Sequence, residues 1–166
     1  KITPILFENF LNKKNIKLDF ENILVYQGKN ISLSNMDEYK YNNLVFYGNH
    51  FFDHWNTVNL SDEEIKYQYL TNEKYLKKYP NYLNYFAFTH GTPDVNFNYN
   101  NLKLILSLNP SKVFCVTGGY NLNFGDSRKK VLTRTFISKN ELDNGIFGYR
   151  LLRGNILKKQ HKNYFN

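Results

Sequence analysis

Residues 44–65 read LVFYGNHFFDHWNTVNLSDEEI and contain, in order, a short apolar run, a histidine pair and a helix start. The apolar run at 44–47 is typical of a buried strand. Ser61 with Glu64 three residues later forms a capping-box pattern, which predicts a helix beginning at Ser61. His50 and His54 fall between these two elements. Functional side chains of α/β proteins gather just past the carboxyl ends of strands, so this loop is a candidate site.

Alternating strand and helix patterns extend to both sides of this stretch. Thr3 and Pro4 suit the start of a helix with an apolar face, and a polar, irregular segment is expected at 28–41. The other expected elements are a strand at 23–26, the helix from Ser61 ended before Pro80, a strand at 85–88, a helix at 100–108, and strands at 113–117 and 132–137. This order predicts an α/β fold with a mostly parallel sheet, in a single domain over 1–166. The first expected element is a helix, whereas a parallel α/β fold usually begins with a strand. We therefore expect the first strand of such a fold to be missing from this sequence.

The composition suits one well-packed domain and argues against two classes of function. The chain has 166 residues, of which 42% are hydrophobic. No apolar run approaches the roughly 20 residues of a membrane span. The net charge of +8 would suit a nucleic-acid partner. The lysines are scattered along the chain, however, so we interpret them as solvated surface charge and expect no nucleic-acid partner. Cys115, inside an apolar run, is expected to be a small core residue.

A basic tail keeps a membrane-surface alternative open. Its members are Arg150, Arg153, Lys158, Lys159, His161 and Lys162. Such a cluster can hold a protein at an anionic membrane by an attraction that salt screens. This interpretation favours a cytoplasmic or membrane-peripheral location, although the sequence itself fixes no compartment.

The histidine pair has a chemical meaning if its two rings converge. Two imidazoles four residues apart can face one metal ion. A catalytic zinc site has three protein ligands and leaves one position for water. The metal lowers the pKa of that water and polarises a substrate carbonyl. A loop pair that only makes hydrogen bonds is the alternative at this point.

Three segments, in this order, resemble the polysaccharide deacetylase (NodB homology) family. Residues 48–54, Gly-Asn-His-Phe-Phe-Asp-His, resemble its metal-binding His-Ser/Thr-x-x-His motif, and 60–65 resemble the helix start that commonly follows. Residues 86–91, Phe-Ala-Phe-Thr-His-Gly, look like the Phe-Ala-Tyr-Pro-Tyr-Gly form of the groove motif. Residues 132–137, Leu-Thr-Arg-Thr-Phe-Ile, are similar to a late Leu-Pro-Arg-Ile strand of one branch. The matches cover roughly residues 4 to 138, and their order is more specific than any single motif.

The resemblance implies a distorted (β/α) barrel that removes an N-acetyl or O-acetyl group from a sugar or polysaccharide, in surface-glycan biosynthesis or modification. It implies a divalent metal ion, zinc by preference, with His50 and His54 as ligands. It gives catalytic roles to His90, whose backbone N–H helps to hold the oxyanion, and to Arg134, which orients a catalytic carboxylate. The residues expected to contact the substrate are Phe88, Thr89 and Trp55.

The sequence also departs from the family pattern. Nothing matches the Thr-Phe-Asp-Asp-Gly motif that supplies the catalytic base and the third metal ligand, and no Leu-x-His motif supplies the late histidine. Thr89 and His90 stand where the family has Pro and Tyr. Asp53 and Asp94 are the candidate substitute carboxylates, and Asp94 is the better placed because it follows the turn at Gly91.

Alternatives stay open for these residues. His90 also fits a surface histidine after a strand, Phe88 and Trp55 fit core aromatics, and Arg134 fits a structural ion pair. For the whole protein, the second hypothesis is a non-catalytic carbohydrate-binding relative that kept the fold and lost its acids.

Overall fold

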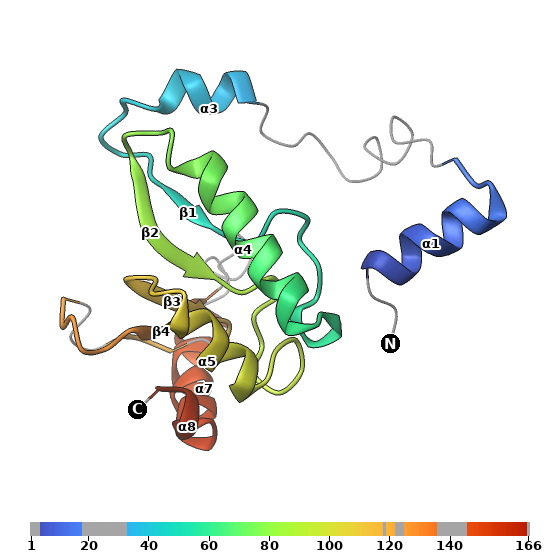
Figure 1. The fold of residues 1–166 in the computed structure, drawn as a ribbon. Coiled ribbons are helices and arrows are strands. Elements are labelled where there is room, and N and C mark those ends of the chain that lie inside the picture. The colour runs from blue at the N-terminus through green and yellow to red at the C-terminus, as the bar shows by residue number, and fades with distance from the viewer. Residues whose placement is uncertain (1–3, 18–32, 118, 122–124, 136–145, 166) are drawn as a thin grey trace.

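Four parallel strands form the centre of the protein (Figure 1). The structure is a computed structural model that describes residues 4–17, 33–117, 119–121, 125–135 and 146–165. The strands are β1 (Tyr47–Asn49), β2 (Tyr82–Ala87), β3 (Lys112–Cys115) and β4 (Val131–Thr133), and they lie side by side in this order. Each neighbouring pair is parallel, which confirms the predicted α/β class and the strand direction. Within the described ranges the sheet is open, with β1 and β4 at its edges.

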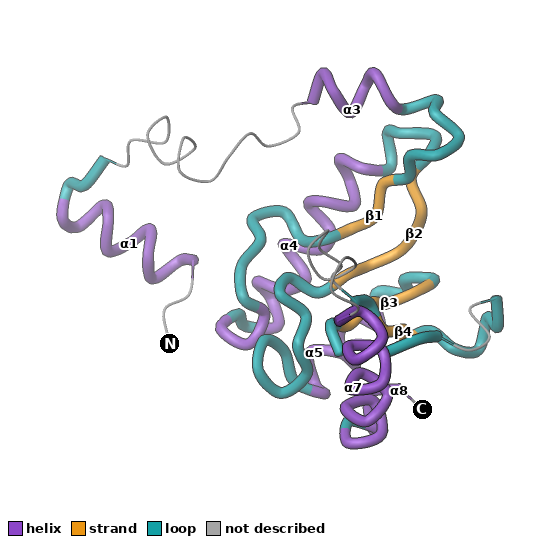
Figure 2. Tube along the Cα trace, turned by 180° about the vertical axis from the view of Figure 1, so that it is seen from behind, coloured by secondary structure: helices purple, strands orange, loops and turns teal. Residues whose placement is uncertain are grey.

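Some of the helices pack against this sheet and others lie apart from it. The described helices are α1 (Pro4–Lys14), α3 (Leu33–Tyr39), α4 (Asp62–Leu76), α5 (Tyr99–Ser107), α7 (Ile146–Gln160) and α8 (Lys162–Phe165), with a 3-10 turn η1 (Thr57–Asn59). α4 packs along β1 and beside α5, and α8 contacts α5, α7 and β4. Figure 2, seen from behind, shows α1 well apart from the sheet. None of the helices in the described ranges has the length and apolarity that a membrane span requires.

The start of α4 confirms the capping-box prediction. The Ser61 hydroxyl accepts a hydrogen bond from the Glu64 N–H at 3.3 Å, and the Glu64 carboxylate accepts one from the Ser61 N–H at 2.8 Å. The apolar face that follows is buried, with Ile65 and Tyr69 at most 1% exposed. The helix ends at Leu76, ahead of the proline at position 80.

The strand predicted at 44–47 is displaced, because β1 occupies Tyr47–Asn49. Asn42 explains the shift. Its side-chain oxygen accepts from the Leu44 N–H at 2.8 Å, and its carbonyl accepts from the Val45 N–H at 3.3 Å. This local turn competes with strand pairing, and it leaves Leu44 90% exposed. The apolar run was therefore the wrong guide to the strand, while the position of the loop after it is as expected.

Most other boundaries are close to those predicted. The helices expected from Pro4 and at 100–108 correspond to α1 and α5, and the strands expected at 85–88, 113–117 and 132–137 correspond to β2, β3 and β4. The strand expected at 23–26 lies outside the described residues, as do positions 136–137.

The irregular segment expected at 28–41 is wrong in its second half, where Leu33–Tyr39 forms α3. This short helix carries Met36 and Glu38, which are good helix formers. The polar composition of the segment concealed that local propensity.

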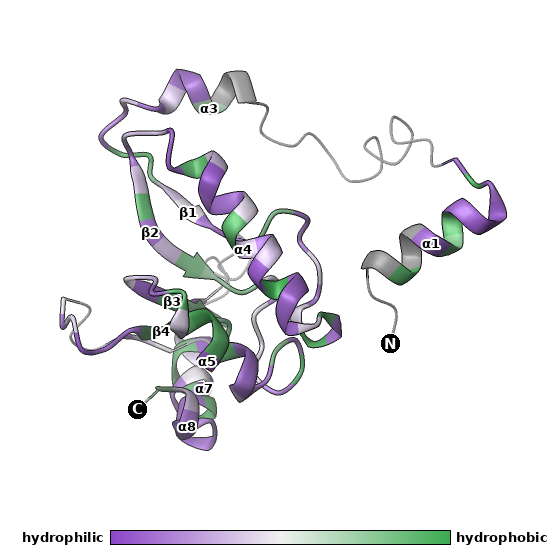
Figure 3. Ribbon diagram, in the orientation of Figure 1, coloured by the Kyte–Doolittle hydropathy of each residue, from purple (hydrophilic) through white to green (hydrophobic). Residues whose placement is uncertain are grey.

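The core lies between the sheet and the helices α4 and α5. Phe88 and Phe97 stack with ring centroids 3.8 Å apart, and Phe86 meets Phe88 edge-on at 5.0 Å. Burying each such ring contributes about 1.5–3 kcal/mol. Cys115 is fully buried among them, as predicted, and burial raises the pKa of its thiol to about 12. Figure 3 shows the same apolar concentration at the end of β2 and along α5.

Candidate functional site

Three histidines meet at the carboxyl ends of β1 and β2. His50 directly follows β1, and His90 lies three residues past the end of β2. The ring of His54 lies between them, with centroids 4.8 Å from His50 and 5.0 Å from His90, both edge-on. The three side chains line one open pocket of about 410 Å³, together with Val116, Arg134 and Thr135. The parallel sheet thus brings the two predicted loops together, since β1 and β2 are neighbours.

His50 is held in one tautomer. Its Nδ1 lies 2.7 Å from the carbonyl oxygen of Ala87, so Nδ1 carries the hydrogen and donates. Nε2 therefore keeps its lone pair, which is the state of a metal ligand or a proton acceptor. Burial lowers the pKa of His50, and the positive charge of Arg134 lowers it further, although the bond to Ala87 opposes both. The imidazole of His50 is accordingly neutral at neutral pH.

His54 is more exposed, but it is also neutral at neutral pH. Partial burial lowers the pKa of its ring most, and the neighbouring His90 lowers it further. Its backbone is in the left-handed region with φ 56°, and the same is true of Phe51 at 63° and His90 at 59°. This conformation costs residues other than glycine about 1–2 kcal/mol each. Other contacts must therefore hold the two loops in place.

Asn49 provides one set of these contacts. It is 1% exposed. Its amide nitrogen donates to the Tyr69 carbonyl at 2.9 Å. Its amide oxygen accepts from the Phe51 N–H at 3.1 Å and from the Asn72 side chain at 3.0 Å. Asn49 thereby fastens the end of β1 to α4 and holds the backbone on the far side of His50 at Phe51.

Gln68 provides the second set. It is 3% exposed on the sheet-facing side of α4. Its amide oxygen accepts from the Phe52 N–H at 3.1 Å and the Asp53 N–H at 2.8 Å. Its amide nitrogen donates to the Asp53 carboxylate at 2.7 Å. Phe52 and Asp53, between the two histidines, are thus tied to the buried face of α4, and the Asp53 carboxylate has a structural partner.

Sequence reasoning missed Asn49 and Gln68. A signal existed for Gln68, because it and Asn72 recur at helical spacing with Ile65 on the buried face of α4. Polar residues on an apolar helix face need partners, so they point to a buried hydrogen-bond network.

Gly91 fixes the second loop against β3. Its φ is +75°, its N–H donates to the Thr89 carbonyl at 2.6 Å, and its carbonyl accepts from the Val116 N–H at 2.6 Å. A Cβ at this position would lie 2.9 Å from a Val116 methyl and 3.1 Å from the Arg134 guanidinium. Only glycine allows the backbone to approach this closely.

Arg134 borders the pocket but has a different partner from the one expected. Its guanidinium donates to the Phe88 carbonyl at 2.6 Å, and burial lowers its pKa. Its Nε is buried and has no hydrogen-bond partner among the described residues. Neither a catalytic carboxylate nor a structural ion pair is seen at Arg134 in the described part of the chain. Arg134 therefore stabilises the His90 loop and leaves one N–H donor unused.

The residues expected to bind substrate divide into two groups. Phe88 is fully buried in the stack with Phe97, so no face of its ring is open to a sugar. Thr89 is fully buried as well, and its hydroxyl donates to the Trp55 carbonyl. Phe88 and Thr89 are therefore structural residues here, in place of the contact role expected from the family. Trp55 is partly buried and packs against the core.

Asp94 does not supply a third group to the histidine pocket. Its carboxylate accepts from Tyr164 and lies 3.0 Å from Nδ1 of His161, which joins the loop after β2 to the C-terminal helices. Asp94 is not among the residues lining the histidine pocket. Across the described ranges, no three His, Cys, Asp or Glu side chains are grouped closely enough to hold a metal ion. The described residues therefore offer imidazoles and no carboxylate for such a site.

The chain was compared with known proteins at the level of sequence and of structure. No protein-family model, curated protein or solved structure matches it. The family resemblance consequently rests on the order of the sequence motifs, and the functional argument rests on the geometry of the histidine pocket.

Proposed function

We propose that the protein is a metal-dependent carbohydrate deacetylase of the polysaccharide deacetylase type, acting on an N-acetyl or O-acetyl group of a sugar or polysaccharide. In this proposal the four strands are part of a distorted (β/α) barrel. One observation supports it above all: the two loops that resemble the family's metal and groove motifs place His50, His54 and His90 around one pocket. His54 and His90 are 36 residues apart in the sequence.

The residues fit part of a metal site. His50 and His54 are neutral, and the hydrogen bond to Ala87 leaves Nε2 of His50 as the free nitrogen. A third ligand is not grouped with them in the described ranges, so the proposal requires one from elsewhere in the chain. A bound divalent ion, zinc by preference, would supply polarisation of the acetyl carbonyl and a water of lowered pKa.

Four side chains of the pocket have roles in this proposal. His50 and His54 would hold the metal ion, with Asn49 and Gln68 keeping their loop in place. His90, exposed at the pocket, would help to hold the oxyanion through its backbone N–H. Arg134 lines the pocket, and its positive charge would stabilise the negative charge that develops on the acetyl oxygen.

The experiment measures metal content and turnover on the same protein. Purified protein is dialysed against zinc, and its zinc content is measured by elemental mass spectrometry. The same protein is then incubated with N-acetylated oligosaccharides while acetate release is followed. We expect about one zinc ion per chain, and loss of both zinc and acetate release in His50→Ala and His54→Ala. Equal zinc content in the wild type and both variants would exclude the metal site. Acetate release that is unchanged in the variants would exclude the catalytic role.

A non-catalytic carbohydrate-binding protein is the second candidate. The engagement of Asp53 by Gln68, and of Asp94 by Tyr164 and His161, favours it, because both candidate carboxylates have structural partners. This candidate predicts binding of acetylated oligosaccharides that persists in a metal chelator, without acetate release. Binding that disappears with the metal would instead support the enzyme.

A further inference from the structure

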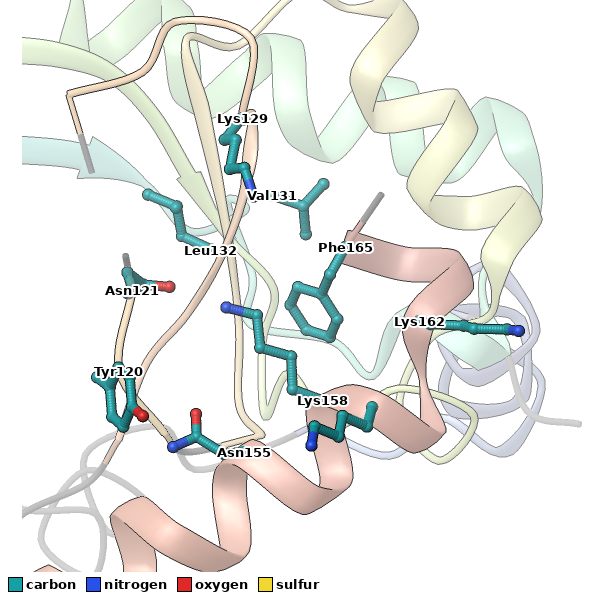
Figure 4. A pocket seen from close by; sticks show the side chains of 10 residues that line it. Tyr120, Asn121, Lys129, Val131, Leu132, Asn155, Lys158, Lys162 and Phe165 are labelled. Carbon is teal, nitrogen blue, oxygen red and sulfur yellow. The ribbon is translucent and has the colours of Figure 1, made fainter. Parts of the chain in front are cut away.

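A second pocket, of about 450 Å³, lies between β4 and the C-terminal helices (Figure 4). One wall is formed by β4 together with Lys129, Tyr120 and Asn121, and the other by α7 and α8. It shares no lining residue with the histidine pocket. Val131, Leu132 and Phe165 give it an apolar part, and a volume of this size suits a small organic molecule.

Lysines dominate the polar lining of this pocket. They are Lys129, Lys158, Lys159 and Lys162, and no Asp or Glu lines the pocket with them. No ion pair joins any of the four to a carboxylate in the described ranges. Residues 146–166 contain no acidic side chain at all. Asp126, which pairs with Arg128, also attracts Lys129 from outside the pocket lining, so the positive charge of the lining is only partly offset.

Lys158 is the central cation. Its side chain reaches across the pocket towards Asn121 and Leu132, whereas Lys162 points away (Figure 4). Its ammonium lies 5.5 Å from the centre of the Phe165 ring. Partial burial lowers the pKa of Lys158, and the nearby charge of Lys129 lowers it further. Two like charges held together with no acidic side chain in the pocket lining are unfavourable, and a bound anion reduces this cost.

We propose that this pocket binds the phosphoryl group of an organic phosphate, with Lys129 and Lys158 holding its oxygens. A phosphoryl group carries up to two negative charges and several acceptor oxygens, which matches two or more ammonium groups better than a single carboxylate does. The organic part of the ligand lies against Val131 and Phe165. This inference does not depend on the deacetylase proposal, because the two pockets are lined by different residues.

The phosphate can come from a soluble ester or from a lipid headgroup. Tyr149, Leu152 and Ile156 are 60–67% exposed and recur at helical spacing along α7. Helices with an exposed apolar stripe and basic neighbours lie on anionic membranes. The experiment therefore includes a probe for each source.

The first arm uses inorganic pyrophosphate as the probe, titrated into the full chain by calorimetry at low salt. We expect the double variant Lys129→Ala/Lys158→Ala to bind at least about tenfold more weakly than the wild type, because charge-assisted hydrogen bonds are lost. The matched control is Lys66→Ala/Lys74→Ala, which removes the same charge from exposed positions of α4. Pyrophosphate is also expected to raise the melting temperature of the wild type and the control, but not that of the pocket variant.

The second arm uses sedimentation with phosphatidylcholine vesicles, with and without phosphatidylglycerol. Binding only to the anionic vesicles, lost in the pocket variant and in Leu152→Glu but kept in the control, identifies a lipid headgroup as the source. Pyrophosphate binding with no vesicle binding identifies a soluble phosphate ester. Equal losses in the pocket variant and the control would mean non-specific attraction and would overturn the proposal. So would wild-type protein that binds neither probe, or a pocket variant that binds as the wild type does.

Discussion

Replacing Gln68 with leucine tests whether α4 holds the histidine loop. The change keeps a side chain of similar size in a site that is 3% exposed, but removes three hydrogen bonds of 2.7–3.1 Å to Phe52 and Asp53. A typical hydrogen bond contributes about 1 kcal/mol, and water can replace part of the loss at the exposed loop, so we expect a loss of about 2 kcal/mol of unfolding free energy.

Urea unfolding followed by Trp55 fluorescence measures this loss. Trp55 is the only tryptophan of the chain and follows the second histidine directly, so it reports on the loop itself. Gln160→Leu, at an exposed position of α7, is the matched control and is expected to stay within about 0.5 kcal/mol of the wild type. A second measurement follows the ring protons of His50 by NMR. A looser loop lets water reach the ring, so the pKa of His50 is expected to rise towards its ordinary value. A Gln68→Leu protein as stable as the control, with an unchanged pKa, would refute the role assigned to Gln68.

Three further predictions concern the histidines, the glycine turn and the cysteine. Lowering the pH from about 7 to about 5 is expected to reduce the unfolding free energy. The reason is that burial lowers the pKa of His50 and His54 in the folded protein, so the unfolded chain binds protons at these positions first. In urea titrations over a pH series, changing both histidines to glutamine is expected to make the unfolding free energy less dependent on pH in this range. Gly91→Ala, with φ +75° and a neighbouring methyl 2.9 Å from the new Cβ, is expected to cost about 1–3 kcal/mol in thermal melts. Gly125→Ala, with nothing within 4 Å, is expected to be nearly neutral. Cys115, buried with a pKa raised to about 12, is expected to resist iodoacetamide until urea is added, and rapid modification of the folded protein would contradict its core position.

The elements with strong local signals were predictable from sequence. The capping box at Ser61 located α4 to the residue, and the alternation of strand and helix gave the parallel sheet. The strand before the histidines was misplaced because Asn42 forms a turn through its own side chain, which competes with the apolar run at 44–47. The periodicity of apolar residues predicts which segments are buried on average. It does not predict a single side-chain hydrogen bond that forms a local turn.

The candidate site was predictable in its histidines but not in their neighbours. Parallel strand ends meet at one edge of a sheet, which is why His50 and His90, following neighbouring strands, line one pocket. Phe88 and Thr89 could equally be core or groove residues by sequence, and the stack with Phe97 places Phe88 in the core. Asp94 was placed by its distance from Gly91 along the chain, whereas its partners lie about 70 residues further on. Contacts at that separation depend on tertiary packing, which local pattern does not encode.

Backbone strain gives a separate reason to regard the histidine pocket as functional. Phe51, His54, His90 and Asp94 all have positive φ, and all four lie in the loops after β1 and β2. Glycine or asparagine would adopt these angles at lower cost, by about 1 kcal/mol or more at each position. Histidines that only make hydrogen bonds would gain nothing from such positions. The fold instead offsets the strain with buried amides at Asn49 and Gln68 and with the close contact at Gly91. A strained loop backbone held in place by hydrogen bonds is expected where the position of the imidazoles matters more for function than the stability of the loop. This reasoning uses no family motif, so it applies to the enzyme and to the binding protein alike.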